Sequence, residues 1–122
     1  MISFLKSRIP AFKNAFSGIW YVIRTQKNAW IHLIATAVAV TLGFWLKLSS
    51  LEWTLIVFSI VFVWSSEVFN TSLEAIFDIL VDEPHPLVKI GKDVGAAAVL
   101  VSSLASLIIG LLIFLPKIIE LF

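Results

Sequence analysis

The chain has 122 residues, of which 60% are hydrophobic and 14% are charged, and its formal net charge is +1. Soluble domains carry about 25% charged residues, so this composition, with a mean hydropathy of +1.02, excludes an ordinary soluble domain. The sequence contains no cysteine, which excludes disulfides and thiol chemistry. We therefore expect an integral membrane protein with one domain over residues 1–122 and no nucleic-acid partner.

The first predicted element is an amphipathic helix over residues 7–27. Its apolar residues recur mostly three or four positions apart, as on one face of a helix, and cations occupy the other side. Pro10 favours a first helical turn, so the prediction starts this helix near Ser7. A helix with aromatic side chains opposite cations is typical of a membrane surface, although a fourth helix packed on the bundle is an alternative. The apolar residues are Leu5, Ile9, Phe12, Phe16, Ile19, Trp20 and Ile23.

Three membrane-spanning helices follow, over residues 29–47, 51–81 and 87–116. Each contains an apolar run of a length suited to a hydrocarbon core about 30 Å thick. The connection near residues 47–50 is so short that the first two spans should form an antiparallel hairpin. Pro84 and Pro86 should end the second span, and residues 95–98 are small enough to allow close helix packing. The predicted fold class is all-α, with three transmembrane helices and an N-terminal surface helix.

The positive charges predict the orientation of these spans. Seven of the nine Lys and Arg residues precede the first span or lie between the second and third, whereas Lys47 and Lys117 lie at the opposite ends. Cytoplasmic loops of membrane proteins are enriched in Lys and Arg. We therefore expect the N-terminus and the second connection to be cytoplasmic.

Four polar residues form a stripe on the second predicted span. Glu67, Asn70, Glu74 and Asp78 fall at roughly 0°, 300°, 340° and 20° around a helix, so they share one narrow face. A charge at membrane depth costs about 2.5–3.5 kcal/mol on insertion scales, and such residues usually face a bundle interior, a partner or water. The stripe is therefore the candidate functional site.

The residue types in the stripe favour phosphoryl transfer. Carboxylate and amide oxygens suit Mg²⁺, a carboxylate free of metal can act as a general base, and Lys92 could supply a cation from the next helix. The chain has neither a Walker loop nor a Gly-x-Gly-x-x-Gly loop, so side chains and helix ends would have to hold a nucleotide. Buried acids also serve as proton relays, so a small ion-coupled transporter stays an alternative.

Two segments carry a resemblance to a known family. One runs from Glu67-x-x-Asn70 through Glu74 to Asp78, and it is followed by a His85-Pro-Leu turn and by Lys92-Asp93-x-Gly95-Ala-Ala-Ala. This segment closely resembles the prokaryotic diacylglycerol kinases, which include the undecaprenol kinases. A second segment, Arg24-Thr-Gln-Lys-Asn-x-x-Ile-His-Leu33, with Phe12-x-x-Ala15-x-x-Gly18-Ile19 before it, is similar to the undecaprenol kinase branch.

The resemblance implies a multi-pass protein of the bacterial inner membrane, a homotrimer whose active sites are shared between subunits. It implies ATP as phosphoryl donor, Mg²⁺ as cofactor and a membrane lipid hydroxyl as acceptor, with undecaprenol favoured over diacylglycerol.

By position, Glu67 matches the family's general base and Glu74 matches its metal ligand, while Asn70 and Asp78 match other polar positions of the site. Gln26 stands where family members usually carry a second carboxylate for the metal. An amide oxygen can coordinate Mg²⁺ but brings no charge. A membrane subunit that has lost catalysis through this change is therefore another alternative.

Four further residues match nucleotide-binding positions of the family, together with Gln26 and Glu74. Lys92 and Asp93 match a pair near the phosphates, and Glu83 and His85 match a loop that contacts the nucleotide. Without the resemblance, the commoner interpretation of Glu83 and His85 is a polar turn bounded by prolines. His32 is interpreted as an interfacial or packing residue.

Overall fold

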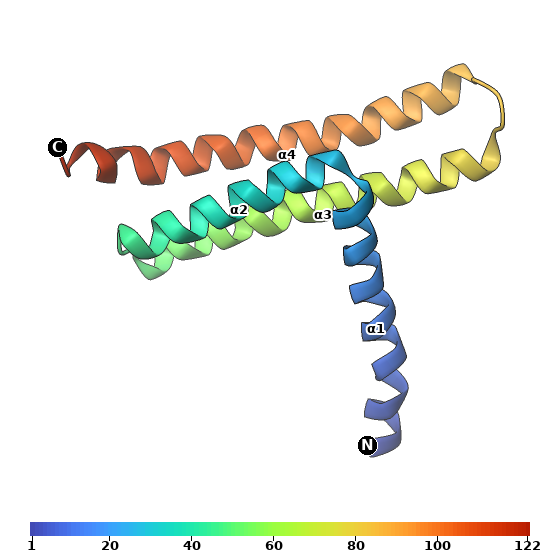
Figure 1. The fold of residues 1–122 in the computed structure, drawn as a ribbon, viewed down its shortest axis with the longest axis horizontal. Helices are drawn as coiled ribbons and strands as arrows, with labels where there is room; N and C mark the ends of the chain where they lie inside the picture. The colour runs from blue at the N-terminus through green and yellow to red at the C-terminus, as the bar shows by residue number, and fades with distance from the viewer.

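The computed structural model describes all 122 residues. It contains four helices and no strand: α1 (Ile2–Thr25), α2 (Lys27–Trp45), α3 (Ser50–Leu80) and α4 (Pro86–Ile119) (Figure 1). The last three are long and apolar enough to cross a membrane. The predicted all-α membrane fold is confirmed, and the predicted span bounds differ from those of α2, α3 and α4 by at most three residues.

Helix α1 begins at Ile2, earlier than the predicted start at residue 7, and it contains Pro10 in its interior. Proline lacks the N–H that would bond to the carbonyl of Lys6 one turn earlier. Every residue before Tyr21 is exposed in the chain, so solvent can hydrate that carbonyl instead. The prediction that Pro10 lies in the first turn, and that the helix therefore starts near Ser7, was wrong.

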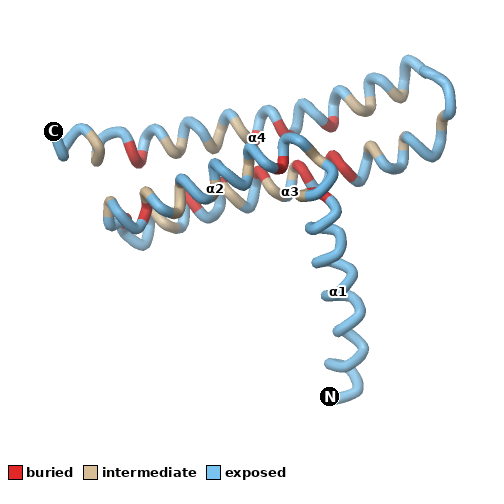
Figure 2. Tube along the Cα trace, in the orientation of Figure 1, coloured by how far each residue is buried: buried red, intermediate tan, exposed pale blue.

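Helix α1 points away from the bundle that the other three helices form (Figure 1). Gln26, with φ −94° and ψ 120°, is the single extended residue that separates α1 from α2. Only Val22 is buried along α1 (Figure 2). The alternative of a fourth helix packed along the bundle is therefore wrong for the single chain, and the apolar face of α1 is left free.

A tight turn joins α2 to α3 as the predicted hairpin. Lys47 adopts a left-handed conformation with φ 53°, which ends α2. Ser49 then starts α3 with a capping box, in which the Ser49 N–H donates to Glu52 Oε2 at 2.7 Å and the Glu52 N–H donates to Ser49 Oγ at 3.3 Å. Reciprocal capping satisfies two backbone donors that a helix start leaves free.

The connection between α3 and α4 lies beyond the start of α2, so both helices extend past α2 at this end (Figure 1). His85 caps α4, because its Nδ1 accepts a hydrogen bond of 3.2 Å from the Leu87 N–H, and Pro86 occupies the first turn. Proline fits this position because the first helical N–H has no intrahelical partner. The result is an α3–α4 hairpin whose loop end carries Glu74, Asp78 and Lys92.

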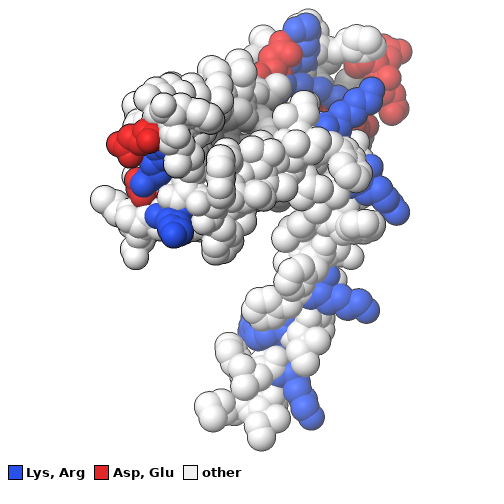
Figure 3. Space-filling view, turned by 60° about the vertical axis from the view of Figure 1, so that its left-hand side comes forward, with Lys and Arg blue, Asp and Glu red and all other residues white.

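Helix α4 packs along α3 through small residues. Ser59, Gly95 and Ser102 are buried at this interface, and Ser106 Oγ donates to the Ser59 carbonyl at 3.1 Å. Large apolar side chains are instead mostly exposed, and the bundle has an uncharged middle between charged ends (Figure 3). Membrane helices associate in this way because lipid solvates apolar side chains, whereas close backbone approach provides packing energy.

We expect Gly95→Ala to destabilise the protein, because a Cβ at position 95 would collide with Asn70 Oδ1. Overpacking of this kind costs about 1–3 kcal/mol, whereas Ala is otherwise preferred to Gly in a helix by up to about 1 kcal/mol. Gly110→Ala is the matched control on the same helix, since its Cβ would meet no atom closer than 4.0 Å. When thermal unfolding is followed in detergent, the midpoint temperature should fall below that of the wild-type chain for Gly95→Ala only. Equal midpoints for the two variants would contradict this account of the packing.

Candidate active site

The predicted polar stripe lies along the α3–α4 interface, and its burial decreases toward the loop end. Glu67 is 1% exposed and Asn70 is buried, whereas Glu74 is partly buried and Asp78 is exposed. The stripe thus runs from the interior of the bundle to its surface. A carboxylate at the buried end is far more sensitive to its partners than one at the exposed end, because water screens the latter.

Glu67 is paired with a residue of α2. His32 Nε2 lies 3.3 Å from Glu67 Oε2, and the side chain of His32 is 11% exposed. The His32 ring also meets Trp64 edge-on, with ring centroids 6.1 Å apart. The interpretation of His32 as a packing residue therefore omitted a contact with the candidate base.

A sequence signal for this pair existed in the predicted hairpin. His32 lies 16 positions before Leu48, and Glu67 lies 18 positions after Ser49. Residues at matched distances from a tight turn lie level with each other in antiparallel helices. Only the rotation of each helix about its axis, which the turn does not determine, was missing from the prediction.

Asn70 and Glu74 form the middle of the stripe. Asn70 Nδ2 donates to Glu74 Oε1 at 3.2 Å, and Asn70 Oδ1 is buried beside Gly95 without a hydrogen-bond partner. A buried oxygen without a donor is destabilising by about 1–3 kcal/mol, so such atoms often mark a binding site. The orphaned oxygen points to a ligand that can supply a positive charge or a donor here.

The exposed end of the stripe is an ion pair between helices. Lys92 Nζ of α4 bonds to Asp78 Oδ1 of α3, so the structure brings together these two predicted site residues. Asp93 is not part of this pair and bonds instead to Lys89, one turn earlier on α4. Exposed pairs contribute little to stability, typically below about 1 kcal/mol, so a phosphate could displace Asp78 from Lys92 at small cost.

No hydrogen bond or ion pair joins the remaining predicted residues to the stripe within one chain. Gln26 Nε2 donates to Thr25 Oγ1 at 3.2 Å at the α1–α2 junction, and Glu83 and His85 are exposed in the loop before α4. No group of three His, Asp or Glu side chains in the chain is arranged to hold a metal ion. The roles of these three residues stay predictions.

The donors near Glu74 nevertheless fit a hard divalent cation. Asn70 Oδ1 is buried and unpaired, Glu74 supplies a carboxylate next to it, and Asp78 supplies another one turn further along. Mg²⁺ prefers oxygen ligands and commonly uses one or two carboxylates with water and phosphate in the remaining positions. The chemistry of this set therefore suits the predicted metal.

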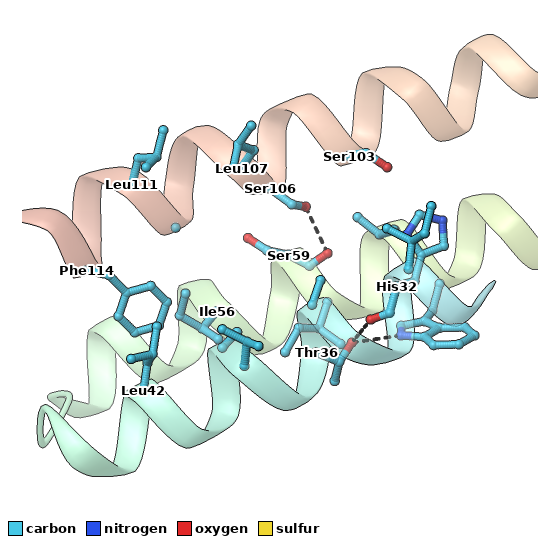
Figure 4. Close-up of a pocket in the computed structure, with 18 of the residues that line it drawn as sticks. His32, Thr36, Leu42, Ile56, Ser59, Ser103, Ser106, Leu107, Leu111 and Phe114 are labelled. Carbon is cyan, nitrogen blue, oxygen red and sulfur yellow. Dashed lines mark hydrogen bonds between the residues drawn. The ribbon is translucent and has the colours of Figure 1, made fainter. Parts of the chain in front are cut away.

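An apolar cavity of about 590 Å³ lies between α2, α3 and α4 (Figure 4). Its walls are mainly aliphatic and aromatic, and Phe114 lines the end remote from His32. Its few polar side chains are His32, Thr36, Ser59, Ser103, Ser106 and Trp64. His32 lines the cavity and also contacts Glu67. The apolar cavity is therefore next to the buried end of the polar stripe.

Comparisons with known proteins identify the family of this chain. A sequence profile described as prokaryotic diacylglycerol kinase matches residues 13–114. An undecaprenol kinase of Bacillus subtilis is 43% identical over 107 residues, which cover 88% of this chain and 87% of the relative.

Two diacylglycerol kinases are more distant. The one from Synechocystis is 32% identical over 114 residues, covering 93% of this chain and 65% of the relative. The one from Escherichia coli K12 is 32% identical over 111 residues, covering 85% of this chain and 91% of the relative. The matched region contains α2, α3 and the whole polar stripe, so the chain belongs to the prokaryotic diacylglycerol kinase family.

Proposed function

We propose that this chain is an ATP-dependent lipid kinase that phosphorylates the hydroxyl of a membrane lipid at the cytoplasmic surface of a bacterial inner membrane. The observation that carries the proposal is the carboxylate of Glu67, buried where an apolar cavity adjoins a stripe of oxygen ligands. A lipid alcohol and a nucleotide require such a junction, because one dissolves in hydrocarbon and the other in water. The relatives' names, undecaprenol kinase and diacylglycerol kinase, support this reaction class.

In the proposed reaction Glu67 accepts the proton of the lipid hydroxyl. The hydroxyl oxygen then forms a bond to the γ-phosphorus of ATP, the bond from that phosphorus to the bridging oxygen breaks, and ADP leaves. Lys92 stabilises the charge on the transferring phosphoryl group after it exchanges Asp78 for phosphate. Bound Mg²⁺ would neutralise phosphate charge, with Glu74 and Gln26 as its protein ligands and Asn70 and Asp78 as further oxygen donors.

We extend the proposal to a homotrimer with shared active sites. In such a trimer a neighbouring subunit would complete the site. The predicted nucleotide-binding residues Gln26, Glu83, His85 and Asp93 form no hydrogen bond or ion pair with the stripe within one chain, so they are available for such contacts. The exposed apolar surfaces of the bundle leave room for such contacts. The distribution of Lys and Arg supports a cytoplasmic N-terminus, which would place the α3–α4 loop and α1 on the nucleotide side.

Undecaprenol is the acceptor that we favour, with diacylglycerol second. The similarity to the undecaprenol kinase of Bacillus subtilis, at 43%, exceeds that to the two diacylglycerol kinases, at 32% each. The transporter alternative gains no support from these relatives. A catalytically degenerate subunit is tested by the Gln26 variant below.

The central test compares undecaprenol and diacylglycerol as acceptors with radiolabelled ATP in mixed micelles. We expect phosphorylation of at least one alcohol, with undecaprenol preferred, and a loss of about 10²- to 10⁴-fold for Glu67→Gln, the usual contribution of a general base. Glu52→Gln is the matched control, since Glu52 is on the same helix but pairs with Lys117 at the opposite end. Phosphorylation of neither alcohol by the wild-type chain would refute the proposed function.

Restoring the second carboxylate should strengthen metal binding. We expect Gln26→Glu to lower the Mg²⁺ concentration for half-maximal activity several-fold, because it adds a negative charge to an otherwise neutral ligand. Asn28→Asp, which adds a charge at an exposed position two residues later, should leave the Mg²⁺ dependence unchanged. A silent parent chain that gained activity only with Gln26→Glu would favour the degenerate subunit.

The apolar cavity is the proposed site for the hydrocarbon chain of the acceptor. Gly110→Leu would fill part of it, so the KM for the lipid should rise several-fold while the KM for ATP stays unchanged. Leu112→Phe is a control of increased volume on the same helix, because Leu112 is exposed and lies outside the cavity. If the KM for the lipid were the same for Gly110→Leu and the wild-type chain, the cavity would not be the site of the hydrocarbon chain.

A further inference from the structure

The Glu67 carboxylate has one side-chain partner in the chain, and that partner has no role in the function proposed so far. The contact is the 3.3 Å approach of His32 Nε2 to Glu67 Oε2. Thr71 is close by, but its hydroxyl donates to the Glu67 backbone carbonyl rather than to the carboxylate. His32 is therefore the side chain that hydrogen-bonds to this buried carboxylate.

The proposed role of Glu67 as a base sets the direction of the hydrogen bond. An ionised carboxylate only accepts hydrogen bonds, so it requires the proton to be on His32 Nε2. A buried carboxylate without such a donor is strongly disfavoured in its charged form. A general base must be ionised before the reaction, so the proposed role of Glu67 depends on this donor.

The imidazole of His32 is held on rigid structure. Trp64 packs edge-on against the ring, and Trp64 Nε1 donates to Thr36 Oγ1 at 3.1 Å. Thr36 Oγ1 in turn donates to the His32 backbone carbonyl at 2.7 Å, and these contacts join α2 to α3 (Figure 4). Groups that are locked by their neighbours orient a reacting side chain without further loss of freedom on binding.

We propose that His32 is a positioning residue for Glu67, an inference that rests on the proposed kinase function. The neutral imidazole donates its Nε2–H to Glu67 Oε2 and keeps the carboxylate ionised and fixed. Glu67 Oε1 then takes the proton as the O–H bond of the lipid alcohol breaks and its oxygen bonds to the γ-phosphorus. His32 stays bonded to Oε2 throughout, so its own proton is not transferred.

Two substitutions separate this role from simple packing. His32→Gln keeps an N–H donor at similar reach, whereas His32→Leu fills the space without a donor. Loss of a hydrogen bond to a charged group corresponds to about 10- to 100-fold in rate, so we expect His32→Leu to lower kcat by that factor with the KM for ATP unchanged. His32→Gln should recover most of kcat. In a Glu67→Gln background His32→Leu should cause no further loss, because the two residues act as a unit.

A second measurement does not depend on turnover. Carbodiimides modify buried carboxyl groups in their protonated form, so mass spectrometry after treatment at neutral pH reports the state of Glu67. We expect several-fold more labelling of Glu67 in His32→Leu than in the wild-type chain or His32→Gln. Ser102→Ala, which removes another fully buried side-chain hydrogen bond, should label as the wild-type chain does.

The kinase assay and the labelling of Glu67 test the proposed function and the role of His32 independently. A wild-type chain that phosphorylated no lipid would refute the proposed function, but the labelling comparison would still decide whether His32 holds Glu67 ionised. Equal labelling in His32→Leu and the wild-type chain would overturn the inference. A loss of kcat in His32→Gln as large as that in His32→Leu would also overturn it, because the N–H donor retained by Gln would then not support activity.

Discussion

The burial of Glu67 in a bundle of apolar helices is the constraint on which the rest of the site depends. A carboxylate that is 1% exposed in such surroundings cannot rely on water, so it needs a hydrogen-bond donor within the protein. The partner is His32 of α2, and this contact links α2 to the α3–α4 hairpin at the level where the apolar cavity meets the polar stripe. One interaction thus contributes both to packing and to the chemistry of the site.

The gradient of burial along α3 gives the other residues their different properties. Glu67 and Asn70 are in the interior, where an unpaired atom is costly, and Asp78 is at the surface, where its bond to Lys92 contributes little. A weak ion pair at the surface can exchange partners, whereas a buried pair cannot. In the proposed reaction this matches the needs of the two substrates, since nucleotides must bind and leave while the base must stay in place.

Much of this architecture could be predicted from the sequence, because it depends on local rules. Uncharged runs and prolines located the three long helices to within three residues, and the helical period placed Glu67, Asn70, Glu74 and Asp78 on one face. The predicted start of α1 was wrong because Pro10 lies in the interior of the helix, where the carbonyl that loses its partner is on an exposed segment. The contact between His32 and Glu67 was missed because it depends on how two helices are rotated against each other. The nucleotide-binding roles of Gln26, Glu83 and His85 stay predictions, since none of them bonds to the stripe within one chain.

The position of the stripe also limits how two dissimilar substrates can meet. Glu67 and Asp78 are separated by 11 residues, which is about 16 Å along a helix. The apolar cavity reaches His32, beside the buried end, and the α3–α4 hairpin carries the exposed end beyond the start of α2. In the proposed function a hydrocarbon chain would approach Glu67 from the apolar cavity, and a triphosphate would approach it along the polar stripe. Asn70 Oδ1, which is buried without a partner one turn from Glu67, would then lie close to the reacting groups.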